Sequence, residues 1–235
     1  MFNPNPAMSK VALGDGRFCV VVDNILTDPA GLIAFAVAHR AQFSPEDANY
    51  YPGPELLLDA RAEKMFEGFF TQHIRGQLGA RRTRDTSCRM SIVTRQPHSL
   101  VPFQRIPHVD GGALSPGEGY FAMVLYLFND PRMGGTSFFK PRVDSAAISA
   151  LMDQARVLSN DAFSALIDSP PGYPDKSNAY FDKVATVPAV FNRAIFYDGK
   201  HYHSGDIPHP ELLSPDPQLG RLTVNAFFDV RLNAG

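Results

Sequence analysis

The feature that most restricts the fold is a series of short segments rich in β-branched and aromatic residues, which begins near residue 86. The segments read TSCRMSIVTR, GYFAMVLYLFN, GTSFFKP, NRAIFYDG and RLTVNAFFDVRL. Such residues favour strands, and the glycines and prolines between them favour turns. Many short strands of this kind are typical of a β-sandwich or barrel.

The sequence before these segments predicts one strand and two helices. Residues 18–26 form a continuous apolar run that predicts a strand, and residues 29–41 follow with a helix-start signal. Residues 59–79 carry apolar side chains near a 3.6-residue period, which predicts a helix that stops at Gly79. Residues 44–57 are interpreted as a loop. We therefore expect an α+β architecture in which N-terminal helices buttress a mainly β core.

A helical pattern interrupts the strand series. Residues 144–167 predict a helix, and a proline-rich loop follows it, so the stretch of about 144–180 is interpreted as an insertion between strands. A chain of 235 residues suits one domain. We expect a single domain over 1–235, with the strand and helices in 1–87 and the β core in 88–232.

Composition limits the partners. The 22 basic and 24 acidic residues give a net charge of −2 without a basic cluster, so no nucleic-acid or membrane-surface partner is predicted. Cys19 and Cys88 form no CxxC motif, which argues against a disulfide framework or a structural zinc site. No signal peptide or membrane span is predicted, and we expect a cytoplasmic protein. The oligomeric state is not predicted.

Candidate metal ligands occur in two places. His108 and Asp110 precede a strand and, being two residues apart in extended chain, can face one ion together. Either His201 or His203 could supply a third ligand, and two histidines with one carboxylate are typical of non-haem Fe(II) sites. We prefer His203, although strand alternation alone does not choose between the two. The simpler interpretation of His108 and Asp110 is a loop ion pair.

A candidate anion site follows downstream. Arg221 and Thr223 lie on one face of a predicted strand, where a guanidinium and a hydroxyl could grip a carboxylate together. Alternatively, Arg221 forms a surface ion pair and Thr223 is simply a good strand residue. Arg89 and Arg95 share a face of an earlier predicted strand, where either could meet a polar substrate; we prefer the interpretation that this face is solvated.

Taken together, His108-x-Asp110, YLFNDPRMGGTSFF (126–139), FYDGKHYHSGD and Arg221-x-Thr223 resemble the prolyl-hydroxylase-like branch of the Fe(II)- and 2-oxoglutarate-dependent dioxygenases, over residues 88–232. The resemblance implies a double-stranded β-helix, which is a jelly-roll or cupin-like fold. It implies Fe(II) and 2-oxoglutarate as cofactors, with O2 as co-substrate. The implied site residues are His108, Asp110 and His203 for iron, and Arg221, Tyr126 and Thr223 for 2-oxoglutarate. Tyr126 lies in an apolar run, so a core tyrosine whose hydroxyl is satisfied locally is the alternative to a ligand contact.

The resemblance implies an oxidoreductase that hydroxylates a C–H bond of an amino acid, a peptide or a small metabolite and releases succinate and CO2. Asp110 argues against a halogenase, in which that carboxylate is absent. The chain departs from the family pattern in its helical insertion and in a long interval between His203 and Arg221. Two other functions stay open, namely a non-catalytic cupin-like metal- or ligand-binding protein and a zinc-dependent hydrolase with the same three ligands.

The sequence does not identify the substrate. Loops on a rigid scaffold commonly determine specificity. We expect that role for the segments 44–57, 96–107, 168–180 and 206–220.

Overall fold

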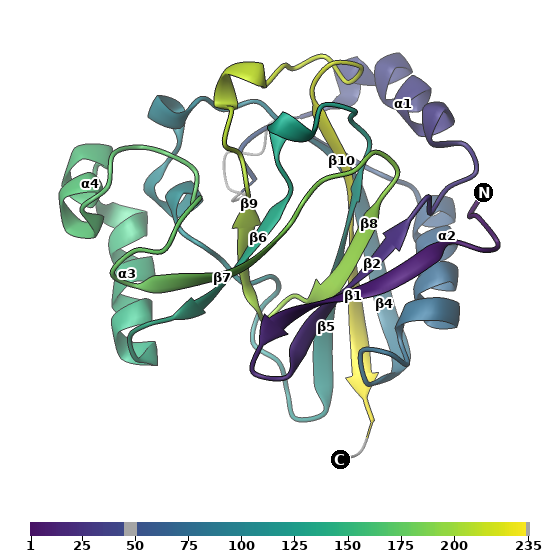
Figure 1. Ribbon diagram of the computed structural model, residues 1–235, viewed down its shortest axis with the longest axis horizontal. Helices are drawn as coiled ribbons and strands as arrows, with labels where there is room; N and C mark the ends of the chain where they lie inside the picture. Colours follow the sequence, from purple (N-terminus) through teal and green to yellow (C-terminus); the bar gives the residue numbers. More distant parts are fainter. Residues whose placement is uncertain (45–50, 234–235) are drawn as a thin grey trace.

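The computed structural model describes residues 1–44 and 51–233, and in this part the strands form two antiparallel sheets (Figure 1). The larger sheet has the strand order β1-β2-β8-β5-β10-β4-β3 and the smaller has the order β7-β6-β9. The strands are β1 (Ala7–Gly14), β2 (Arg17–Asp23), β3 (Glu55–Leu57), β4 (Ala80–Val93), β5 (Glu118–Tyr126), β6 (Thr136–Pro141), β7 (Phe181–Val187), β8 (Ala194–Asp198), β9 (Tyr202–Gly205) and β10 (Arg221–Leu232).

The larger sheet buries both of its faces, and alternation along each strand divides the side chains between them. In β2, Val20 and Val22 pack on the helical side, whereas Cys19 and Val21 pack toward the smaller sheet, where Phe138 of β6 meets them. Two sheets stacked face to face in this way form a double-stranded β-helix, or jelly roll. The mainly β fold expected from the sequence is therefore confirmed.

Two N-terminal helices cover the outer face of the larger sheet, as predicted (Figure 1). Helix α1 (Pro29–Ala38) begins at Asp28, whose carboxylate accepts a hydrogen bond from the Gly31 N–H at 2.9 Å. Helix α2 (Ala60–Phe69) continues as a π-helical turn, Phe70–Ile74. The ring of Phe70 stacks on Phe228 of β10 at 4.0 Å and so fastens this turn to the sheet.

The insertion contains two helices rather than the single helix predicted over 144–167. Helix α3 (Ser145–Val157) ends, and α4 (Asn160–Ile167) begins at Ser159, whose hydroxyl accepts a hydrogen bond from the Ala162 N–H at 3.3 Å. Both helices pack on the outer side of the smaller sheet (Figure 1). The spacing of apolar residues does not reveal the break between the two helices, because both helices bury a face in the same cluster. Only the serine cap marks the boundary.

Four of the described strands were missed by the sequence analysis, namely β1, β3, β7 and β9. Strand β1 carries mostly exposed side chains, so it lacks an apolar pattern, yet it pairs with β2 through a turn in which Asp15 and Gly16 have φ of 52° and 72°. An Asp-Gly pair is the residue choice that such a hairpin turn favours. Strand β7 buries only its first and last residues, and the five residues between them are half-buried on both faces, so it also lacks an alternating apolar pattern. Strand β3 lies within 44–57, so the loop interpretation was wrong there, and residues 45–50 lie outside the described residues.

In the described part of the chain, no helix is long and apolar enough to span a membrane. The helices instead bury their apolar faces in the clusters already described.

Candidate metal centre and adjoining pocket

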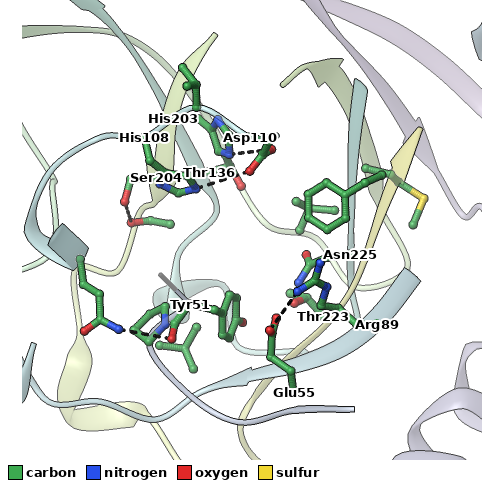
Figure 2. Close-up of a pocket in the computed structure, with 18 of the residues that line it drawn as sticks. Tyr51, Glu55, Arg89, His108, Asp110, Thr136, His203, Ser204, Thr223 and Asn225 are labelled. Atoms are coloured by element: carbon green, nitrogen blue, oxygen red, sulfur yellow. Dashed lines mark hydrogen bonds and ion pairs between the residues drawn. The ribbon is translucent and has the colours of Figure 1, made fainter. Parts of the chain in front are cut away.

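The side chains of His108, Asp110 and His203 converge at one end of the space between the sheets (Figure 2). Their ligand atoms all lie within 4.8 Å of one another. Asp110 Oδ1 is 3.7 Å from His108 Nε2, and Asp110 Oδ2 is 3.3 Å from His203 Nε2. This spacing allows one small cation to contact all three residues.

The backbone fixes this arrangement. His108 and His203 form an antiparallel bridge, in which each N–H donates to the carbonyl of the other residue, at 3.0 and 2.9 Å. The N–H of Asp110 donates to the Gly199 carbonyl at 2.7 Å, on the turn between β8 and β9. The His108-x-Asp110 segment is thus paired with the segment that carries the distal histidine, which explains why residues 95 positions apart in sequence meet.

His203, not His201, lies beside His108 and Asp110. His203 Nδ1 is 2.9 Å from the carbonyl of His201, so its Nε2 faces Asp110. The His201 ring points away from this cluster: its Nδ1 is 3.5 Å from Arg17 Nη1, and the ring packs edge-on against Phe138. His201 lies in the turn before β9, which begins at Tyr202, so the rule that residues two apart share a face of a strand does not apply to this pair.

Electrostatics keep the carboxylate ionised. Burial acts to raise the pKa of Asp110, but the two neighbouring imidazoles outweigh it and the pKa is lowered overall. Burial acts to lower the pKa of His203, yet the facing carboxylate raises it above its ordinary value. Burial, together with His203, lowers the pKa of His108 to about 4. Near pH 6.5 the proton of this cluster therefore resides on His203, while His108 is neutral.

The residues fit a divalent metal. Asp110 Oδ2 is shielded from solvent, and its nearest partner among the residues that the structure describes is His203 Nε2 at 3.3 Å, in a geometry that falls short of a hydrogen bond. A buried carboxylate oxygen without a hydrogen bond is costly unless a cation or another donor occupies its free side. Two imidazole nitrogens and one carboxylate oxygen suit Fe(II), and they also suit zinc.

Metal binding is expected to release about one proton per protein near pH 6.5, because a cation must displace the proton of His203. The affinity should rise with pH until the raised pKa of His203 has been passed. Titration calorimetry with Zn(II) in two buffers of different ionisation enthalpy measures the release. A heat that is the same in both buffers would contradict the expected protonation of His203.

A cavity of about 490 Å³ opens beside these three residues. Its lining includes Arg221 and Thr223 of β10, which alternate with residues of the helical side and so point between the sheets. Both are buried, at 3% and 1% exposure. The structure thus brings two of the three predicted cosubstrate residues into the same cavity as the metal cluster.

The guanidinium of Arg221 is held by the turn before β6. Its Nε donates to the Met133 carbonyl at 3.0 Å, and its Nη2 donates to the Gly135 carbonyl at 2.7 Å. The ring of Phe128 lies 5.4 Å below the charge. These contacts fix the direction of a cation in the pocket wall before any ligand arrives.

Tyr126, the third predicted cosubstrate residue, is placed differently. Its hydroxyl is fully buried in the core and lies 2.9 Å from Thr136 Oγ1, and it is Thr136 that lines the cavity. Burial raises the pKa of Tyr126 beyond its ordinary range, so the phenol stays protonated. Direct contact of Tyr126 with 2-oxoglutarate stays a prediction, and the geometry favours an action through Thr136.

Substituting Gly134 with alanine is expected to destabilise the protein by about 2 kcal/mol or more, because the residue has φ +74° and a Cβ would lie 1.6 Å from the Asp206 carbonyl oxygen. Urea denaturation measures the loss. Gly112→Ala is the matched control, since a Cβ there meets no atom within 4 Å. Equal stability of the two variants would show that the turn before β6 tolerates a shift.

The sequence analysis missed several residues of the cavity wall. Arg89, interpreted as part of a solvated face, lines the cavity with Asn225, and Glu55 lies behind it. Tyr51 also lines the cavity, and burial raises the pKa of its phenol to about 12 against the opposing effects of Arg221 and Thr223. The alternation of polar residues along β4 and β10 carried the signal, but the pairing of the strands was needed to interpret it.

The chain was compared with known proteins. A family model described as a family of unknown function (DUF6445) matches residues 4–228. No curated protein matches the chain significantly. Among solved structures, a Pseudomonas putida prolyl-4-hydroxylase is similar at 12% identity, with a TM-score of 0.48 over 93% of this chain and 95% of that chain.

Two further solved structures are similar to the chain. HygX from Streptomyces hygroscopicus with iron bound shares 9% identity and a TM-score of 0.48, over 92% of this chain and 83% of that chain. SnoN, described as a non-heme alpha-ketoglutarate-dependent epimerase from nogalamycin biosynthesis, shares 12% identity and a TM-score of 0.46 over 92% and 82%.

Proposed function

The chain belongs to the family of unknown function DUF6445, and we propose that it is an Fe(II)- and 2-oxoglutarate-dependent dioxygenase. One observation carries the proposal: a cluster of two histidines and a carboxylate shares a cavity with a buried arginine and a threonine hydroxyl. The cluster matches the ligand set typical of non-haem Fe(II). The arginine and hydroxyl match the groups that bind a carboxylate.

In this proposal, His108, Asp110 and His203 would hold the metal beside the cavity that all three residues line. Asp110 supplies the negative charge, and the two imidazoles bind as neutral ligands, His203 after loss of its proton. When bound, Fe(II), 2-oxoglutarate and O2 would supply the oxidation: 2-oxoglutarate would become succinate and CO2 with uptake of one oxygen atom of O2, and the other oxygen atom would convert a substrate C–H bond to C–OH. The chain itself positions the reactants and keeps water out.

Arg221 and Thr223 would bind the carboxylate of 2-oxoglutarate remote from the metal. Because Arg221 is already bound to the backbone carbonyls of Met133 and Gly135, its orientation costs little at the moment of binding. Tyr126 would hold Thr136 against the same end of the cavity. Tyr197, whose ring lies edge-on 4.8 Å from His203, covers the metal ligands from the side of the core.

The proposed partner is a small-molecule or peptidyl substrate. The chain carries a net charge of −2 without a basic cluster, so we propose no nucleic-acid partner. A cytoplasmic location stays a prediction.

The test is anaerobic addition of Fe(II) and 2-oxoglutarate to the metal-free protein. A weak visible absorption band of the complex is expected, followed in air by slow formation of succinate. Metal binding without a band, and without succinate, would favour a cupin-like binding protein. Zinc-dependent hydrolysis that is insensitive to Arg221 substitution would favour a hydrolase.

A further inference from the structure

One strand, β10, lines the cavity with three polar residues and one aromatic residue. Its cavity side presents Arg221, Thr223, Asn225 and Phe227, and in the neighbouring strand β4 the residue paired with Asn225 is Arg89. Arg89 and Asn225 therefore lie four residues beyond Arg221, which is roughly 13 Å along a strand. This distance places them outside the proposed cosubstrate site but inside the same cavity.

Asn225 and Glu55 belong to one directional hydrogen-bond network. Ser91 Oγ donates its single proton to Glu55 Oε1 at 2.8 Å, so it can only accept from Asn225 Nδ2, at 2.9 Å. The amide nitrogen of Asn225 is thereby directed at Ser91, and its carbonyl oxygen is turned away from the network. No donor among the described residues reaches that oxygen.

Arg89 is fixed by the same network. Its Nη1 donates to Glu55 Oε2 at 3.1 Å, and its charge lies over the Phe227 ring at 5.0 Å. The Arg89 side chain is 27% exposed, whereas that of Glu55 is only 6% exposed, so the cation lies on the cavity side of the pair. Within the described part of the chain Nη2 has no acceptor, which leaves it able to donate to a ligand.

The network thus presents a charged donor and a carbonyl acceptor next to each other. In Figure 2, Arg89 and Asn225 face the cluster of His108, Asp110 and His203 across the open space. Phe227, Tyr120 and Met123 add apolar wall. A molecule anchored at Arg89 and Asn225 would extend toward the metal.

The charge of the cavity indicates the kind of molecule. Among the described lining residues, Arg89 and Arg221 balance Glu55 and Asp110. A divalent metal and dianionic 2-oxoglutarate also cancel, so the loaded cavity gains no net charge. Such a site favours a ligand that carries both signs, with its anion on Arg89 and its cation on the Asn225 oxygen.

The volume points to a small ligand. A cavity of about 490 Å³ lies in the lower half of the range for a single small-molecule pocket, and here it would hold 2-oxoglutarate as well. We propose that Arg89 binds the carboxylate, and Asn225 the ammonium, of a free α-amino acid, which is the primary substrate. This inference rests on the proposed dioxygenase function, and the loaded site would convert the amino acid to its hydroxylated form as 2-oxoglutarate and O2 become succinate and CO2.

The test uses wild-type protein saturated with Zn(II) and N-oxalylglycine, a non-reacting analogue of 2-oxoglutarate. Each of the twenty standard L-amino acids is added as a probe, and binding is followed by saturation-transfer NMR and calorimetry. At least one amino acid is expected to bind. The corresponding amine, which lacks the carboxylate, and the N-acetyl derivative, which lacks the ammonium, should each bind at least about tenfold more weakly. Arg89→Gln should weaken the amino acid about tenfold or more, and Asn225→Ala severalfold.

Arg95→Gln is the matched control, because Arg95 lies outside the cavity lining and donates to the Ser99 carbonyl. Unchanged binding of N-oxalylglycine to Arg89→Gln shows that this variant is folded. If wild type binds N-oxalylglycine but no amino acid, or if Arg89→Gln binds the amino acid as wild type does, the inference is wrong. If N-oxalylglycine itself does not bind, the dioxygenase proposal fails. The binding measurements with the amino acids are then repeated on protein that is loaded with Zn(II) alone.

Discussion

Replacing His203 with alanine is expected to lower the affinity for Zn(II) or Fe(II) by about 100-fold or more, whereas replacing His201 should change it by less than about threefold. The two histidines are two residues apart, yet only His203 Nε2 approaches Asp110, at 3.3 Å. Loss of a ligand leaves Asp110 and His108 alone with the cation. A two-ligand site cannot retain the affinity of a three-ligand site.

His201→Ala is a stringent control because it removes the same kind of side chain only two residues away, in the turn before β9. It deletes the contacts with Arg17 and Phe138, so some loss of stability is expected. The His201 carbonyl that orients His203 belongs to the backbone and is retained. Metal affinity is measured by competition with a chelating dye at pH 7.5. Similar affinities in the two variants would remove His203 from the metal site.

The second large effect is expected at Arg221. Arg221→Gln should weaken 2-oxoglutarate or N-oxalylglycine by about 100-fold, because a buried positive charge and its charge-assisted hydrogen bonding to the carboxylate are lost. Zn(II) affinity should stay within about threefold of wild type, since Arg221 is not a metal ligand. Calorimetry of the Zn(II)-loaded protein measures both quantities.

The substitution also removes a structural contact, because Arg221 binds the carbonyls of Met133 and Gly135. Arg221→Lys separates the two roles, since it keeps the charge and loses the fork of donors. It should recover part of the affinity. Arg132→Gln is the control, because Arg132 lies on the same turn but pairs with Asp130 at the surface. Full 2-oxoglutarate affinity in both Arg221 variants would leave Arg221 a purely structural residue.

The sequence predicted those features that depend on local pattern. The strand series from residue 86 and the two N-terminal helices predicted the fold class, because apolar periodicity reports which face of an element is buried. It could not reveal β1, whose exposed side chains have no such period. It also could not separate α3 from α4, since both bury a face in one cluster.

For the site, the order of motifs predicted that His108, Asp110, Arg221 and Thr223 share one cavity, as the structure shows. Spacing could not choose between His201 and His203, because residues two apart share a face of a strand, and the choice depends on the strand β9 beginning only at Tyr202, after His201. Tyr126 illustrates a further limit. Its position in the motif was visible, but the contact of its hydroxyl with Thr136 depends on how two sheets pack.

The central position of β10 affects how the protein folds. β10 is synthesised after every other described strand, yet it lies between β5 and β4 and pairs with both. The larger sheet therefore cannot be completed before β10 has been synthesised and has paired with both β5 and β4. Pairing over such long sequence separations is slow. An intermediate would expose two unpaired edges, which invites aggregation. The strand proposed to carry ligand contacts is thus also the one whose insertion completes the larger sheet.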